Sequence, residues 1–150
     1  MSHVSYADFA KTAEGARNAM TALSKSALDL GLDKGISELV KLRVSQINGC
    51  AFCIAFHLKV LRGLHVPQAK LDMLPVWHEA PEFSDAERAA LGWAEEMTAM
   101  AEAAPAEESR EALAPHFSRE QIMGLNISIA GINAWNRMAV AFGFTAAEVP

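Results

Sequence analysis

The chain has 150 residues, of which 51% are hydrophobic, so it is long enough to bury one core without disulfide support. Its formal net charge is -5 and its thirteen lysines and arginines are scattered along the chain, so nucleic acid is not an expected partner. The first residues lack a basic segment followed by an apolar run, and the two cysteines do not resemble an extracellular disulfide framework, so we expect a cytoplasmic protein.

Helical patterns dominate the chain, and the alternating apolar and polar pattern of strands is absent. Most of the predicted helices begin at a capping residue and end at a glycine or at Asn48-Gly49. They span residues 5–30, 34–47 and 50–62, a short segment after Pro67, residues 84–100, a short segment within 101–115, and residues 118–142. This pattern predicts a single all-α domain over residues 1–150.

The most apolar stretch runs from Ile127 to Phe144 and is interrupted by Asn133, Asn136 and Arg137. A membrane-spanning helix of about 20 apolar residues does not carry such a group of polar side chains, so we expect no membrane association. The helix is apolar on nearly all sides, which indicates that it lies at the centre of the domain, packs against another subunit, or does both.

The two cysteines of the chain, Cys50 and Cys53, lie within four residues, and His57 follows four positions later. On a helix that begins at this pair, residues three and four apart share one face. The free backbone N–H groups and the positive dipole end of that helix stabilise a thiolate. The spacing therefore predicts a thiolate, a second thiol able to close a disulfide with it, and a proton acceptor along one stripe.

Glu38 lies on the preceding predicted helix, and the turn at Asn48-Gly49 folds that helix back toward the cysteine pair. A carboxylate beside an imidazole orients its tautomer, and the imidazole can then draw a proton from a thiol. We therefore expect a relay from Cys53 through His57 to Glu38. Taken alone, Glu38 is also compatible with a solvated residue in the first turn of its helix.

The spacing of Glu38, eleven residues, Cys50-x-x-Cys53, three residues and His57 resembles the core signature of the AhpD-like alkylhydroperoxidases, which belong to the carboxymuconolactone decarboxylase family. The segment ELVKLRVSQINGCAFCIAFH, from Glu38 to His57, is similar to the sequences of that family, as is INAWNR from Ile132 to Arg137. The resemblance implies an all-α fold with its redox core at about residues 34–63. It also implies a symmetric homo-oligomer, with trimers and hexamers common.

The resemblance further implies a thiol-dependent peroxidase that reduces organic hydroperoxides or hydrogen peroxide. Cys53 would attack the peroxide, Cys50 would form the disulfide with it, and His57 with Glu38 would relay the proton. An external dithiol, on a lipoyl-bearing or thioredoxin-like donor, would reset the pair, with no metal, flavin or nicotinamide cofactor. The chain departs from some alkylhydroperoxidases by having Phe52 where they carry a second histidine. Its cysteine pair argues against lactone decarboxylation, because the decarboxylating branch generally lacks these thiols.

Two alternatives compete with the peroxidase. The same cysteine pair would serve a thiol-disulfide oxidoreductase or redox sensor with little peroxide turnover. In the second alternative, the pair with His57 and His65 forms a zinc site in a noncatalytic interaction module. On a continuous helix, Cys50 and His57 are about 10 Å apart along the axis. Zinc requires all its donors within about 2.0–2.3 Å of one point, so we do not expect a metal site.

Overall fold

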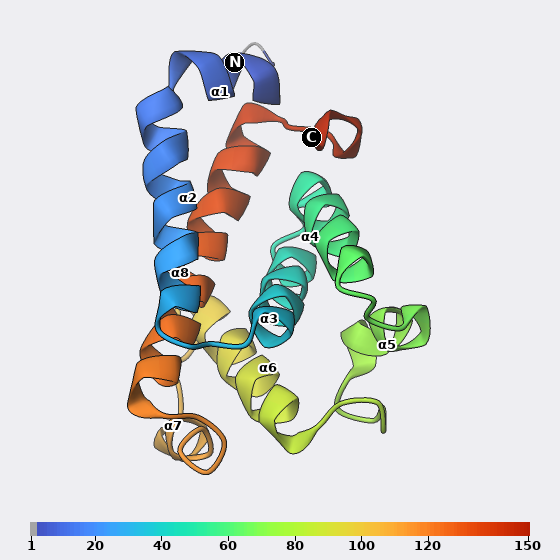
Figure 1. Ribbon diagram of the computed structural model, residues 1–150, viewed down its shortest axis with the longest axis vertical. Helices are drawn as coiled ribbons and strands as arrows, with labels where there is room; N and C mark the ends of the chain where they lie inside the picture. The colour runs from blue at the N-terminus through green and yellow to red at the C-terminus, as the bar shows by residue number, and fades with distance from the viewer. Residues whose placement is uncertain (1–2) are drawn as a thin grey trace.

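The computed structural model describes residues 3–150, and within them the secondary structure is helical with no β-strand (Figure 1). The elements are α1 (Tyr6–Thr12), α2 (Glu14–Asp29), α3 (Lys34–Ile47), α4 (Ala51–Gly63), α5 (Gln68–Met73), α6 (Asp85–Thr98), α7 (Glu107–Glu111) and α8 (Arg119–Phe142), with 3-10 turns η1 (Leu74–Val76) and η2 (Ala146–Glu148). The predicted all-α class is confirmed, and the buried hydrophobic residues form one core.

The prediction of one continuous helix from residue 5 to residue 30 is wrong, because the chain leaves the helical conformation at Ala13, with φ -111° and ψ 41°. The break turns α1 across the end of α8 (Figure 1). As a result the Tyr6 ring lies 5.0 Å from the Phe52 ring and the Phe9 ring lies 5.6 Å from the Phe144 ring, centroid to centroid. Burial of this aromatic cluster opposes the local preference for a continuous helix.

The turn between α3 and α4 forms as predicted. Asn48 ends α3, and Gly49 follows with a φ of 65°, a left-handed conformation that glycine adopts without a steric penalty. The prediction placed Cys50 inside the first turn of the next helix, whereas in the structure Cys50 is the N-cap residue and α4 begins at Ala51. The turn folds α4 back against α3, which positions their facing side chains.

Helix α8 is the central element of the fold. It packs along α2 and also contacts α3, α4 and α6 (Figure 1). The backbones of α2 and α8 approach closely at Gly124, where an added Cβ atom would lie 2.5 Å from the Ala27 carbonyl oxygen. Among residues 3–150, no helix has the length and apolar character needed to cross a membrane.

Candidate active site

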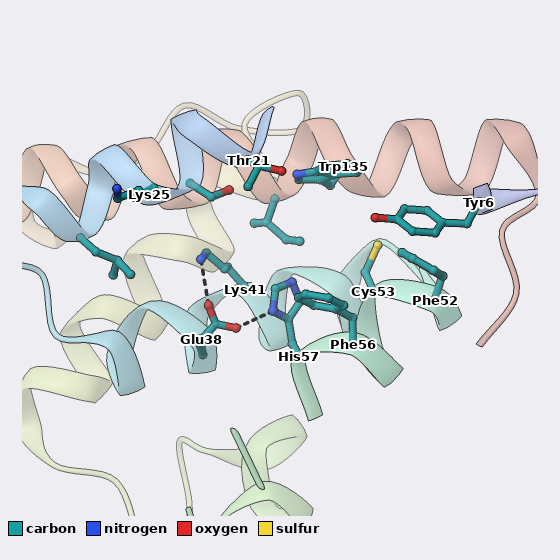
Figure 2. Close-up of a pocket in the computed structure, with 13 residues that line it drawn as sticks. Tyr6, Thr21, Lys25, Glu38, Lys41, Phe52, Cys53, Phe56, His57 and Trp135 are labelled. Atoms are coloured by element: carbon teal, nitrogen blue, oxygen red, sulfur yellow. Dashed lines mark hydrogen bonds and ion pairs between the residues drawn. The ribbon is translucent and has the colours of Figure 1, made fainter. Parts of the chain in front are cut away.

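A pocket of about 320 Å³ lies between α2 and α8 on one side and α3 and α4 on the other (Figure 2). Helices α3 and α4 line it with Glu38, Lys41, Phe52, Cys53, Phe56 and His57. The opposite wall comprises Tyr6, Thr21, Ser24, Lys25, Leu28, Ile132 and Trp135. Three of the four predicted site residues, Glu38, Cys53 and His57, therefore border the same space.

The two cysteines occupy different positions relative to this pocket. They are joined as a disulfide with a Cα–Cα distance of 5.3 Å. Both are buried, at 1% exposure for Cys50 and 3% for Cys53, but only Cys53 is among the residues that line the pocket. A small molecule in the pocket therefore meets the sulfur of Cys53 first.

Cys50 is also the capping residue of the helix that carries Cys53. Its Sγ accepts a hydrogen bond from the backbone N–H of Cys53, with a donor–acceptor distance of 3.2 Å. The helix N-terminus therefore contacts Cys50 most directly, and the predicted stabilisation of a thiolate at this helix end applies first to Cys50.

Glu38 and His57 form a buried pair across the two helices. His57 Nδ1 lies 2.7 Å from Glu38 Oε2, and the two residues are 7% and 6% exposed. If Nδ1 carries the hydrogen and donates it to the carboxylate, Nε2 is left as the proton acceptor of the ring. The predicted contact between Glu38 and His57 is therefore present in the structure.

Lys41 is a member of this cluster that the sequence reasoning did not identify. Its Nζ donates to Glu38 Oε1 at 2.9 Å, and the residue is 6% exposed. Burial raises the pKa of Glu38, but the hydrogen bond and charge of His57, together with Lys41, outweigh burial and lower the pKa to about 2. Glu38 is therefore an ionised carboxylate held from both sides. The sequence feature that could have identified Lys41 is its i, i+3 spacing from Glu38, which places the two side chains on one face of a helix.

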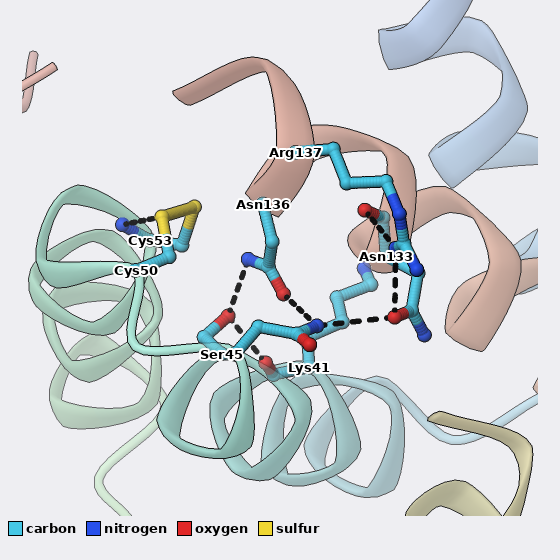
Figure 3. Close-up of a disulfide and its surroundings, with 8 residues drawn as sticks. Lys41, Ser45, Cys50, Cys53, Asn133, Asn136 and Arg137 are labelled. Atoms are coloured by element: carbon cyan, nitrogen blue, oxygen red, sulfur yellow. Dashed lines mark hydrogen bonds between the residues drawn. A yellow bond between two sulfur atoms is a disulfide. The ribbon is translucent and has the colours of Figure 1, made fainter. Parts of the chain in front are cut away.

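A network of polar side chains supports the turn that leads into Cys50 (Figure 3). Asn48 Nδ2 donates to Asn136 Oδ1 at 2.9 Å, and Asn136 Nδ2 donates to Ser45 Oγ at 3.1 Å. Ser45 in turn donates to the carbonyl oxygen of Lys41 at 2.7 Å. These bonds tie the end of α3, which immediately precedes the turn to Cys50, to α8.

The histidine proposed as a further zinc ligand lies away from the cluster. His65 follows the end of α4, where it is exposed and has a φ of 59°. Among residues 3–150, no three His, Cys, Asp or Glu side chains gather in a group that fits a metal ion.

Comparisons with known proteins support the sequence resemblance. The pattern of the carboxymuconolactone decarboxylase family matches residues 14–96. The chain is 34% identical to the uncharacterised protein YdfG of Bacillus subtilis over 129 residues, which cover 86% of this chain and 88% of YdfG.

Two solved structures are similar to the fold. A protein of unknown function from Agrobacterium tumefaciens, provisionally described as the antioxidant defence protein AhpD, is 38% identical with a TM-score of 0.85, covering 91% of this chain and 93% of that chain. A peroxidase-related protein with an alkylhydroperoxidase AhpD core from Ralstonia eutropha is 28% identical with a TM-score of 0.75. The match covers 90% of this chain and 72% of that chain. The chain therefore belongs to the carboxymuconolactone decarboxylase family, and it is an AhpD-like member of it.

Proposed function

We propose that this protein is a thiol-dependent peroxidase that reduces organic hydroperoxides or hydrogen peroxide. One observation carries the proposal: Cys53 lines the same pocket as the buried His57–Glu38 pair, and its disulfide partner Cys50 lies outside the lining. The AhpD and peroxidase-related descriptions of the two similar structures support the same chemistry.

In the proposed reaction, His57 takes the proton of the Cys53 thiol, and Glu38 stabilises the imidazolium that forms. The Cys53 thiolate attacks the terminal oxygen of the hydroperoxide. The O–O bond breaks, Cys53 becomes a sulfenic acid, and the leaving alkoxide takes the proton from His57 to give an alcohol. The Cys50 thiol then attacks the sulfenic sulfur, which releases water and closes the disulfide.

An external dithiol completes the cycle in this proposal. One of its thiolates attacks the disulfide to form a mixed disulfide, and its second thiol displaces the protein, leaving both cysteines reduced and the donor oxidised. A lipoyl-bearing or thioredoxin-like donor is the proposed class. We also propose a cytoplasmic homo-oligomer, a trimer or a hexamer.

The test is dithiol-dependent consumption of hydroperoxide by the wild type and by Cys53→Ser, Cys50→Ser and His57→Ala. We expect near-total loss of turnover in both cysteine variants. His57→Ala should lower the rate by about 10² or more, as expected for loss of a general base. Normal turnover by Cys53→Ser would show that the attacking sulfur is misassigned.

The thiol-disulfide oxidoreductase alternative makes a different prediction in a single turnover. The intact mass and thiol count of the reduced protein are measured before and after one equivalent of peroxide. A peroxidase loses two hydrogens and both thiols rapidly, whereas an oxidoreductase reacts rapidly only with disulfides.

The interaction-module alternative is tested by the metal content of the purified protein. Stoichiometric zinc would support that alternative.

A further inference from the structure

The pocket differs in character at its two ends. The end that holds Cys53 is bordered by the aromatic rings of Tyr6 and Phe52. The far end is bordered by α2, which contributes Ser24 and Lys25. In Figure 2, Lys25 and Cys53 lie at opposite ends of the row of lining side chains. The wall remote from the sulfur therefore offers a lysine and a hydroxyl beside the apolar side chain of Leu28.

The charges along the pocket are also unequal. Glu38 engages Lys41 with one oxygen and His57 with the other, so its charge is already compensated. Lys25 is exposed and forms no ion pair with a carboxylate of residues 3–150. The two lysines and one carboxylate of the lining therefore leave one uncompensated positive charge, and that charge lies at the end remote from Cys53.

The size of the pocket limits the ligand. Its volume of about 320 Å³ is near the lower end of the range for small-molecule sites, which is roughly 300–1,000 Å³. The lining also includes the apolar side chain of Ile132 and the indole of Trp135. This space suits a compact apolar body with a reactive group at one end and an anion at the other.

We infer that the pocket selects a compact organic hydroperoxide bearing a carboxylate remote from its peroxide group. The carboxylate pairs with Lys25 beside the hydroxyl of Ser24, and the peroxide oxygen meets Cys53. This inference rests on the proposed peroxidase function and specifies its substrate class. Because Lys25 is exposed, the pairing is a screened interaction and contributes a modest preference.

The test compares cumene hydroperoxide bearing a para-carboxylate with its methyl ester, which differ in charge at the end remote from the peroxide. Reduced protein is mixed with each compound, quenched by alkylation, and analysed by intact mass for disulfide formation, so no reductant is involved. We expect the acid to react about two- to fivefold faster than the ester, the size typical of an exposed ion pair. Raising the ionic strength from about 0.01 M to about 1 M should remove the preference.

Substitutions at Lys25 locate the effect. Lys25→Met should equalise the two rates, and Lys25→Glu should favour the ester. Lys34→Met is the matched control, because Lys34 is an exposed lysine at the start of α3 and is not among the lining residues. It should keep the wild-type preference.

Equal rates for acid and ester in the wild type, or a preference that persists in Lys25→Met, would overturn the inference. Failure of both compounds to oxidise the cysteine pair would overturn the proposed peroxidase function and the inference with it. The two failures are therefore distinguishable in the same measurement.

Discussion

Glu38 Oε2 lies 2.7 Å from His57 Nδ1, although the two residues are 19 positions apart and belong to different helices. The contact forms because the turn at Gly49 folds α4 back onto α3 and buries both side chains. The carboxylate is held on its other side by Lys41. The orientation of the His57 ring therefore depends on a carboxylate that is itself fixed in place.

Glu38→Gln tests the relay with little change in volume. The amide cannot stabilise an imidazolium as a carboxylate does, so we expect the rate of Cys53 oxidation by a hydroperoxide to fall by about 10². The measurement is the single-turnover rate of disulfide formation. Glu102→Gln, at an exposed position, is the control and should react like the wild type. A wild-type rate for Glu38→Gln would remove Glu38 from the mechanism.

Lys41→Met tests whether Lys41 helps to keep the Glu38 carboxylate ionised and in place. Removing the cation takes away both the hydrogen bond and the charge that Lys41 supplies, so the pKa of Glu38 should rise from about 2. The pKa is measured by NMR titration of the carboxyl carbon. Because Glu38 loses one partner of a buried pair and keeps only His57, we expect the free energy of unfolding to fall by about 1–3 kcal/mol at neutral pH. Lys34→Met should change neither quantity, and an unmoved Glu38 pKa would exclude the proposed support.

The lowered pKa of Glu38 also predicts a pH dependence of stability. A carboxyl whose pKa falls from 4.5 unfolded to about 2 folded contributes stability that is fully present above pH 4.5 and is lost as pH falls toward 2. Because one pKa unit corresponds to about 1.4 kcal/mol, this difference contributes about 3 kcal/mol to the free energy of unfolding. Urea unfolding of the wild type and Glu38→Gln at a series of pH values measures it. The difference in unfolding free energy between the two should shrink across this window, and a constant difference would contradict the prediction.

The positions of the two sulfurs predict which one is oxidised first. In Cys50→Ser, the sulfenic acid on Cys53 has no partner and should persist after peroxide treatment. Dimedone, which reacts with sulfenic acids, should then label Cys53 in that variant. Cys53→Ser should give little or no label on Cys50, because that sulfur is not among the pocket-lining groups. Strong labelling of Cys50 would reverse the proposed roles.

The close approach of α2 and α8 predicts a stability effect outside the pocket. In Gly124→Ala the new Cβ atom would meet the Ala27 carbonyl oxygen at 2.5 Å and the Leu32 Cβ at 3.3 Å. Backbone must move to relieve that overlap, so we expect a loss of about 1–3 kcal/mol in unfolding free energy. Gly131→Ala, where the nearest atom lies at 3.8 Å, is the matched control and should cost less. Equal effects in thermal or urea unfolding would contradict the packing argument.

Much of the fold was predictable because its signals are local. The capping boxes at Ser84 and Ser118 define the starts of α6 and α8, since each joins residues three positions apart. The turn at Gly49 required a left-handed conformation that the sequence indicated. The contact between Glu38 and His57 was predictable for the same reason, because that turn relates the two helices.

Other features required the packed structure. The continuous helix expected through Ala13 breaks because burying Tyr6 and Phe9 among aromatic rings opposes a local preference that is weak. Lys41 has the ordinary appearance of a surface lysine in the sequence. It becomes a buried ion-pair partner only because the face of α3 that carries it is covered.

By itself the sequence determined most of the helices, the spacing of the cysteine pair and the family, since these follow from contacts within a few turns or from the residues of one segment. The tertiary structure decided which cysteine faces the pocket, that Lys41 is a second partner of Glu38, and where Lys25 lies relative to the sulfur. The reason is that these relationships depend on how helices cross and which faces they bury. Short-range preferences do not specify that geometry.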